Sequence, residues 1–273
     1  LCTVRAILKL LETKSNRDEL INMQIPRKGF LYCGVPGLCT ALIGGMVFGT
    51  CDVVGLLLEN GANPYLTDKN GNDPLMCACV YGRLENVKFW LEKHFRDWNL
   101  ESRGRLGNVR NYLNLCVCVC QTHISLKSYQ VALGNAVYMG PDRFELVQYL
   151  VKRGARFHSV TYNGTSNLIS ACANEDADPR VVKYLLENAS QEIMNLKIKP
   201  MTISWCFIYV YAKFAVRTGT NGTALIHSLA ERQGRTALHY AARRGDLGIV
   251  ELMLSMGCSP VAIDNQGMSV KDV

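Results

Sequence analysis

Apolar residues recur at helical spacing along most of the chain, in pairs of short stripes separated by a glycine. Val53-Val-Gly-Leu-Leu-Leu58 and Ile249-Val-Glu-Leu-Met-Leu254 each follow a shorter apolar stretch and place apolar residues on one face of a helix. A glycine between the two stripes, such as Gly49 or Gly245, can adopt positive φ and end the first helix. Neither helix can bury its stripe alone, so the pattern predicts helix pairs that stack and share a core.

The stripes repeat at a constant spacing. Leu42 and Leu75 lie 33 residues apart, as do Gly234 and Gly267. One leucine in the second helix of each pair is predicted to be buried, at Leu57, Leu91, Leu150, Leu185 and Leu252.

One unit gives the repeat a family likeness. The stretch Gly234-Arg-Thr-Ala-Leu-His-Tyr-Ala-Ala-Arg-Arg-Gly245 resembles an ankyrin repeat, whose period is about 33 residues. Its Thr236-Ala-Leu-His239 is similar to the family's Thr-Pro-Leu-His. The likeness extends over residues 40 to 108, 131 to 188 and 234 to 273. It implies an all-α fold, an ankyrin-type helical-repeat solenoid with short hairpin or loop fingers.

The resemblance also implies the domain organisation. We expect a single ankyrin-repeat solenoid over residues 1–273, with about five to seven units. The first unit is expected to be truncated, because Val4, Ile7, Leu8 and Leu11 fit the last helix of an earlier unit.

Residues 110–131 interrupt this pattern. Gly107-Asn-Val109 followed directly by Ala132-Leu133 would continue it, so we expect a loop insertion here. The segment carries Cys116, Cys118, Cys120 and His123. A zinc site would need a second cysteine pair, while the alternation of Cys and Val suits a short strand. We favour a third origin, a retained non-coding segment or recent expansion, with a surface loop as its consequence.

Residues 189–233 are also irregular. A degenerate repeat, with helices over 203–216 and 223–232, is one interpretation, and a helical insertion is the other. The aromatic residues of this stretch are expected to pack onto the stack, namely Trp205, Phe207, Tyr209 and Tyr211.

No motif for catalysis stands out in the chain. It lacks a Gly-rich phosphate loop, a His-Glu-x-x-His sequence and a Gly-x-Ser-x-Gly sequence. His239 resembles a turn-stabilising residue of the family. We therefore expect no enzyme, and no catalytic, cofactor-binding or metal-binding residue.

The composition indicates the cellular compartment and the class of partner. Most of the twelve cysteines stand among apolar neighbours, which favours a reducing compartment, the cytoplasm or nucleus. The net charge of +7 is not concentrated in one block, so nucleic acid is not expected as a partner. The longest apolar run, 203–216 with Lys213 inside it, is shorter than the roughly 18–20 residues that cross a bilayer. We expect a monomer with no membrane partner.

The expected function is that of a protein–protein interaction scaffold or adaptor. In ankyrin-like repeats, the two residues before the first helix's closing glycine tend to line a concave groove. A regulatory ankyrin segment of a larger enzyme or channel is the alternative. The predicted partner-binding residues are Val47, Phe48, Val80, Tyr81, Tyr138, Met139, Arg243 and Arg244 in the groove, with Lys69, Asn70 and Arg235 at the finger tips. The groove is expected to be apolar near Phe48 and basic near Arg243.

Overall fold

The computed structural model describes most of the chain. The described residues are 2–25, 38–68, 71–100, 132–138, 141–157, 159–161, 164–199 and 234–273, together with positions 206, 207, 210, 211, 213, 214 and 218. The chain divides into two compact units, unit 1 over Leu1–Leu106 and unit 2 over Gly107–Val273. Whether they form one continuous solenoid stays a prediction.

Unit 1 consists of short helices that pack in pairs. Its elements are α1 (Cys2–Glu12), α2 (Arg17–Ile21), α3 (Ala41–Phe48), α4 (Cys51–Glu59), α5 (Pro74–Val80), α6 (Leu84–Phe89) and the π-helical turn η1 (Trp90–His94). Thr40 and Asp73 begin α3 and α5 as side-chain caps, since their oxygens accept backbone N–H groups of the first turn at 3.2 and 2.7 Å. The inner helices α3 and α5 pack on each other, and α4 packs on α6.

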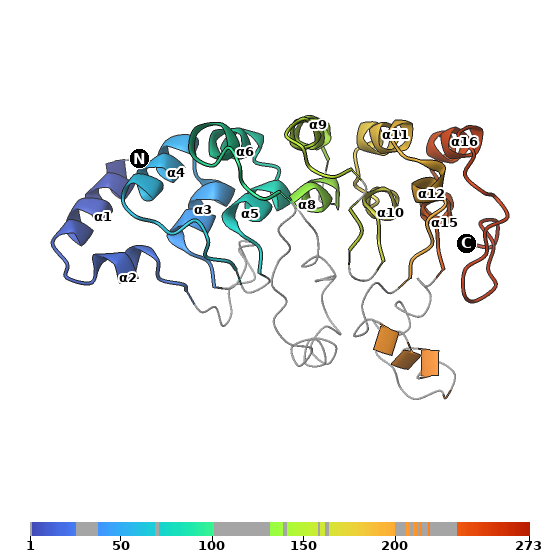
Figure 1. Cartoon of the computed structure of the whole chain (residues 1–273), viewed down its shortest axis with the longest axis horizontal. Coiled ribbons are helices and arrows are strands. Elements are labelled where there is room, and N and C mark those ends of the chain that lie inside the picture. Colours follow the sequence, from blue (N-terminus) through green and yellow to red (C-terminus); the bar gives the residue numbers. More distant parts are fainter. Residues whose placement is uncertain are drawn as a thin grey trace. The chain divides into compact units, whose positions relative to one another are not determined.

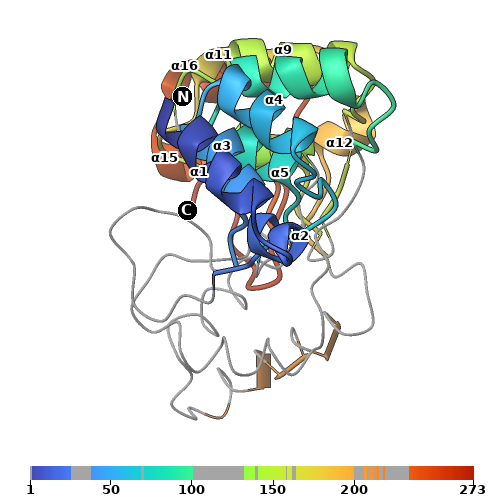
Figure 2. The same cartoon turned by 90° about the vertical axis from the view of Figure 1, so that its left-hand side faces the viewer.

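Unit 2 repeats the arrangement. Its elements are α8 (Ala132–Tyr138), α9 (Phe144–Lys152), α10 (Asn167–Ala173), α11 (Pro179–Glu187), α12 (Gln191–Met194), α15 (Ala237–Arg244) and α16 (Leu247–Ser255). In Figures 1 and 2 the outer helices α9, α11 and α16 form one layer over the inner helices. The inner helix α10 packs on both α8 and α15, and α11 packs on α9 and α16. The predicted all-α repeat architecture is confirmed, and the described residues form no strand beyond three isolated bridges.

The core follows the predicted stripes, with one register error. Leu57, Leu91, Leu150 and Leu185 are buried, with exposed fractions of 6% or less. Leu252 is only half-buried, and Met253 is fully buried in its place. The reason is the spacing within α16, where the buried residues Ile249 and Met253 lie four positions apart, one turn of helix.

Tight hairpins follow the outer helices α4, α9 and α16, and the first two lead to the inner helices α5 and α10. In the tight hairpin at Asp68, the Asp68 N–H donates to Asn72 O and the Gly71 N–H donates to Asp68 O, both at 2.9 Å. Equivalent pairs of bonds close the hairpins that start at Thr161 and Asp264. The glycine of each hairpin has positive φ, between 75° and 87°, which only glycine adopts without strain.

Two further hairpins have the same base but a long tip. Ile198 N–H donates to Arg235 O and Gly234 N–H donates to Ile198 O, both at 2.9 Å. Residues 199–233 therefore stand where the hairpin at Asp68 has only two residues. Similar bonds join Ile25 to Cys39 and to Leu38, and residues 26–37 lie between them. The insertion of residues 199–233 leaves the helix packing uninterrupted, because α15 packs on α10.

The packing of α15 distinguishes between the two interpretations of residues 189–233. Because α15 packs directly on α10, no further helix pair lies between them, which favours an insertion over a degenerate repeat. Phe207 and Tyr211 are 72% and 57% exposed, so the expectation that they pack onto the stack is wrong for these two. Trp205, Tyr209 and the whole segment 110–131, with its cysteines and His123, lie outside the described residues.

The short helices α2 and α12 each precede one long-tipped hairpin and end in an asparagine. Asn22 donates to Gly61 O and accepts from Asn63 N, at 3.2 and 2.7 Å. Asn195 makes the same two bonds to Gly257 O and Ser259 N, at 3.4 and 2.8 Å. Each asparagine thus holds the base of its hairpin to the loop of the following repeat.

Candidate functional site

Two aromatic side chains stand together at the ends of the inner helices of unit 1. Phe48 is the last residue of α3, and Tyr81 follows directly after α5. Their ring centroids lie 5.9 Å apart at an interplanar angle of 56°. Phe48 is 55% exposed, whereas Tyr81 is half-buried against the cluster of Cys39, Ile43 and its neighbours. The pair forms an apolar surface that rests on the core.

The backbone beneath Phe48 is held by the next repeat. The Asn86 side-chain amide donates to Met46 O at 2.9 Å and to Gly49 O at 3.1 Å. The Arg83 guanidinium donates to the same Gly49 oxygen at 3.1 Å. Because these bonds satisfy carbonyls at the end of α3, they fix the turn that carries Phe48. A pre-set aromatic surface loses little side-chain freedom when it binds.

Not every predicted groove residue in unit 1 reaches the surface. Val47 is 2% exposed and packs with Cys39, Ile43 and Cys77, so the prediction that it binds a partner is wrong. The residue precedes Phe48 by one position and therefore points about 100° away around the helix. Val80 is half-buried.

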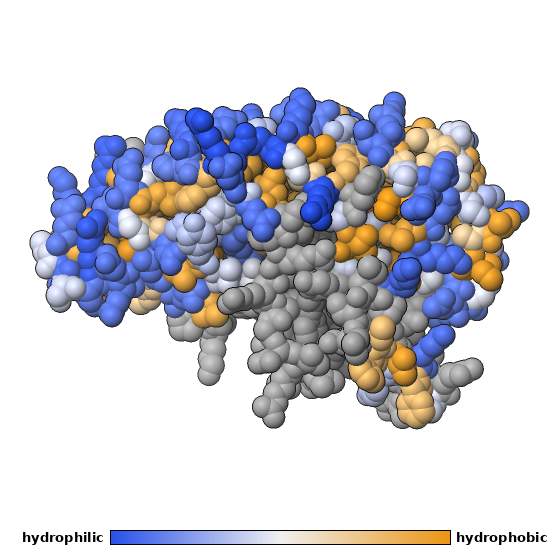
Figure 3. All heavy atoms as spheres, in the orientation of Figure 1, coloured by the Kyte–Doolittle hydropathy of each residue, from blue (hydrophilic) through white to orange (hydrophobic). Residues whose placement is uncertain are grey.

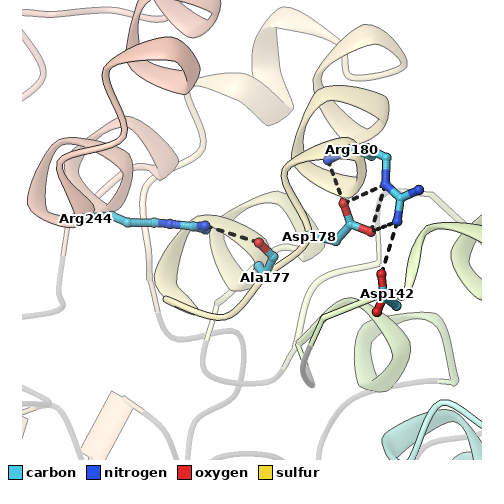
Figure 4. A network of polar contacts seen from close by, with 5 residues as sticks. All are labelled: Asp142, Ala177, Asp178, Arg180 and Arg244. Carbon is cyan, nitrogen blue, oxygen red and sulfur yellow. Dashed lines mark hydrogen bonds and ion pairs between the residues drawn. The ribbon is translucent and has the colours of Figure 1, made fainter.

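In unit 2 the residue at the position equivalent to Phe48 is Arg244, and it binds the neighbouring repeat. Arg244, at the end of α15, donates to Asn174 O at 3.0 Å and to Ala177 O at 3.1 Å, after the end of α10. Figure 4 shows Arg244 reaching Ala177. Its neighbour Arg243 is exposed. The Tyr138 side chain and Met139 lie outside the described residues.

A hollow of about 300 Å³ opens beside this contact, between the turns that follow α8 and α10. Its lining is mainly acidic, from Asp142, Glu175, Asp176 and Asp178. Asp178 caps α11 and holds the Arg180 guanidinium through two oxygens, at 3.0 and 2.7 Å (Figure 4). The hydrogen bonds from Arg180 lower the pKa of the Asp178 carboxyl despite its burial.

The charge of this region differs from the expectation. Glu175 and Asp176 are exposed, while Arg244 is engaged by two carbonyls. The surface near Arg243 therefore carries charges of both signs, which does not support the expected basic end. Sequence alone could not tell an arginine that caps a helix from one that faces solvent.

Arg235 was predicted at a finger tip, and that prediction is also wrong. Its side chain is 8% exposed, and its Nε lies 3.2 Å from Oδ2 of Asp264, which is fully buried. The second Asp264 oxygen accepts the N–H groups of Gln266 and Met268 at 2.8 and 3.0 Å. The ion pair thus joins two successive hairpins. Lys69 and Asn70 lie outside the described residues.

His239 takes the structural role that its resemblance implied. Its Nδ1 accepts the Thr236 N–H at 3.1 Å and lies 2.9 Å from the Thr236 hydroxyl, which closes the first turn of α15. The ring is fully buried, and burial lowers the pKa of His239, although the backbone of Met268 acts in the opposite direction. The burial of the ring and its bonds to Thr236 suit a structural role.

Two buried cysteines of unit 2 have no catalytic character. None of the eight described cysteines forms a disulfide. Burial raises the pKa of the Cys172 thiol to about 12 and that of Cys258 to about 11, so neither carries a reactive thiolate near neutral pH. Within the described ranges, no three His, Cys, Asp or Glu residues gather as a metal site would require.

Family models match two parts of the chain. The ankyrin repeat model covers residues 233–265, and the model for ankyrin repeats in many copies covers residues 45–89. These matches include the second half of α3 and all of α4 to α6 in unit 1, and α15 and α16 in unit 2. No curated protein matches the chain.

Solved structures share the fold. A chain from the structure of the predatory endopeptidase Bd0816 of Bdellovibrio bacteriovorus with immunity protein Bd3460 is 20% identical, with a TM-score of 0.55. The match covers 86% of this chain and 90% of that one. The ankyrin repeat domain of Bcl-3, a member of the IκB protein family, is also 20% identical, with a TM-score of 0.56 over 98% of this chain and 88% of that one. At this identity the likeness carries the fold alone.

Proposed function

This chain belongs to the ankyrin repeat family, and on that premise we propose that it is a scaffold that binds another protein through the inner-helix ends of unit 1. The observation that carries the proposal is the aromatic pair of Phe48 and Tyr81. The exposed Phe packs beside a half-buried Tyr, so the two rings offer a joined aromatic surface that a partner can cover. Aromatic residues are also the usual anchors of protein interfaces.

The similar structures support binding as the mode of action. One of them is a complex between two proteins. We propose that the chain acts by binding rather than catalysis, as a monomer. The eight described cysteines form no disulfide, which supports a reducing compartment, the cytoplasm or nucleus, as its place of action.

The test is capture of a partner from a cell lysate, identified by mass spectrometry and then measured by calorimetry. Phe48→Ser should weaken the affinity by at least about tenfold, because it removes an exposed aromatic contact worth 1.4 kcal/mol or more. Leu10→Ser is the matched control, since Leu10 is a 68% exposed apolar residue of the same unit.

Both variants should melt like the parent chain. If Phe48→Ser binds every captured partner as tightly as the parent does, the site lies elsewhere. If that variant melts several degrees lower, Phe48 is a core residue and the assignment fails.

A further inference from the structure

The insertion between Ile198 and Gly234 carries an exposed apolar helix face. Positions 206, 207, 210, 211, 213 and 214 are helical. Phe207, Val210, Tyr211 and Phe214 are spaced at i, i+3, i+4 and i+7, which is the spacing of residues that share one side of a helix. Their exposed fractions are 72%, 66%, 57% and 61%. Figure 3 shows apolar surface of this segment at the lower right.

The charges around this face have one sign. The sequence has no acidic residue between Glu192 and Glu231, whereas it has Lys197, Lys199, Lys213 and Arg217. Lys199 and Lys213 are exposed. Lys197 lies at the base of the hairpin, where its Nζ donates to Ile263 O at 2.7 Å. Residues 199–233 therefore carry four positive charges, at Lys199, Lys213, Arg217 and Arg232, and one carboxylate, at Glu231.

We propose that this insertion is a membrane-docking element, which places Phe207, Val210, Tyr211 and Phe214 into the interface of an anionic lipid bilayer. Aromatic side chains favour the headgroup region, and nearby lysines are attracted to anionic lipids. The inference is independent of the proposed protein site at Phe48. It revises the expectation that the chain has no membrane partner.

The composition of the helix favours lipid over a protein groove. A helix that binds in a protein groove keeps a polar face toward solvent. Between Ile203 and Val216 only Ser204 and Lys213 are strongly polar, and this stretch is rich in Trp, Tyr and Phe, which favour the interfacial region of a bilayer. Bilayer crossing is not implied, because no helix of the described residues has the length and hydropathy to span a membrane. The face enters the interface only.

Hydrogen bonds at the base of the hairpin hold the insertion to the helix stack. The two backbone bonds between Ile198 and the pair Gly234 and Arg235 close the insertion at its root. Asn195 ties the same root to Gly257 and Ser259. Because hydrogen bonds close the base of the insertion, its apolar side chains can enter a membrane interface without disturbing the packing of α10 on α15.

The test uses the full chain and sedimentation with vesicles. One set contains phosphatidylcholine alone, and the other also contains phosphatidylserine. The chain should sediment with the anionic vesicles, less with the neutral ones, and less at high salt because screening weakens the lysine contribution. The double variant Phe207→Ser/Phe214→Ser should lower the partition onto anionic vesicles by at least about tenfold. Val261→Ser, which alters a residue that is 80% exposed outside the insertion, is the matched control and should bind as the parent does.

Three results would overturn the proposal. The first is no binding to anionic vesicles, or equal binding by the double variant. The second is a lower melting temperature of the double variant, which would assign these residues to the core. The third is capture of an acidic protein that depends on Phe207 and Phe214 while vesicles are not bound. Phe48→Ser should leave vesicle binding unchanged, so failure of this proposal and failure of the protein site are distinguishable.

Discussion

Shortening the hairpin tip at Ile198 tests the architecture of unit 2 most directly. Residues 199–233 are replaced by Lys-Asn, the two residues that separate Asp68 from Gly71 in a tight hairpin. The two backbone bonds at the root, each 2.9 Å, require only that Ile198 and Gly234 come together, as Asp68 and Gly71 do. The helix pairs on either side then keep their contacts.

The magnitude follows from loop closure. Each doubling of loop length costs about 0.6 kcal/mol, and reducing 35 residues to two removes about four doublings. The described side chains of the insertion, including Phe207 and Phe214, are exposed, so little burial is lost. The free energy of unfolding of unit 2 should rise, by up to about 2.5 kcal/mol.

The assay is urea unfolding followed by circular dichroism, with the midpoint and slope compared between the two chains. Leu186→Ala is introduced into both as a control, because Leu186 is fully buried in α11, which packs on α16. Its cost, about 2–5 kcal/mol, should be the same in each chain if the stack is unchanged. A shortened chain that is less stable by more than about 1 kcal/mol would mean that the insertion packs as a repeat, and the reasoning would be wrong.

Two further predictions concern buried polar groups. Arg235→Met should destabilise unit 2 by about 3–5 kcal/mol, because it leaves the Asp264 carboxylate buried without its cation. A loss of less than about 1 kcal/mol in the free energy of urea unfolding would refute this. Lys199→Met, at an exposed lysine, is the control. For His239, burial lowers the pKa in the folded state, so the unfolded chain binds the proton more readily. The free energy of unfolding should therefore fall as the pH drops below 6.5, the ordinary pKa of histidine. His239→Gln should flatten this dependence between about pH 7.5 and 5.5. An unchanged slope would assign the acid sensitivity to other groups.

The repeat was predictable because its contacts are local. The 33-residue spacing, the capping residues Thr40, Asp73 and Thr236, and the leucine stripes are all short-range signals. A helix pair is defined by about thirty consecutive residues, so its pattern survives whatever is inserted between pairs. The all-α fold and four of the five predicted core leucines follow from that property.

Side-chain direction was harder to predict, because one position changes the outcome. Val47 and Phe48 are adjacent and both apolar, yet one is in the core and the other is 55% exposed. Arg235 and Arg243 are both arginines near turns, but only Arg235 faces a buried carboxylate. That partner, Asp264, lies 29 residues away in the next hairpin, so a local sequence pattern does not predict the ion pair.

A longer-range signal was present and was missed. Asp18-Glu-Leu-Ile-Asn-Met-Gln-Ile25 and Gln191-Glu-Ile-Met-Asn-Leu-Lys-Ile198 share a glutamate, an asparagine and an isoleucine at matching positions. The two stretches lie 173 residues apart, which is not a multiple of 33, because insertions intervene. Both form a short helix that ends in a bridging asparagine, and both lead into a long hairpin tip. In both places the asparagine holds the base of a long hairpin to the loop of the following repeat. In a fold stabilised by contacts between successive pairs, the hairpin tip is the place where extra chain costs only loop entropy. New binding surfaces can therefore be added there without changing the stack, and the aromatic face of Phe207 and Phe214 occupies such a place.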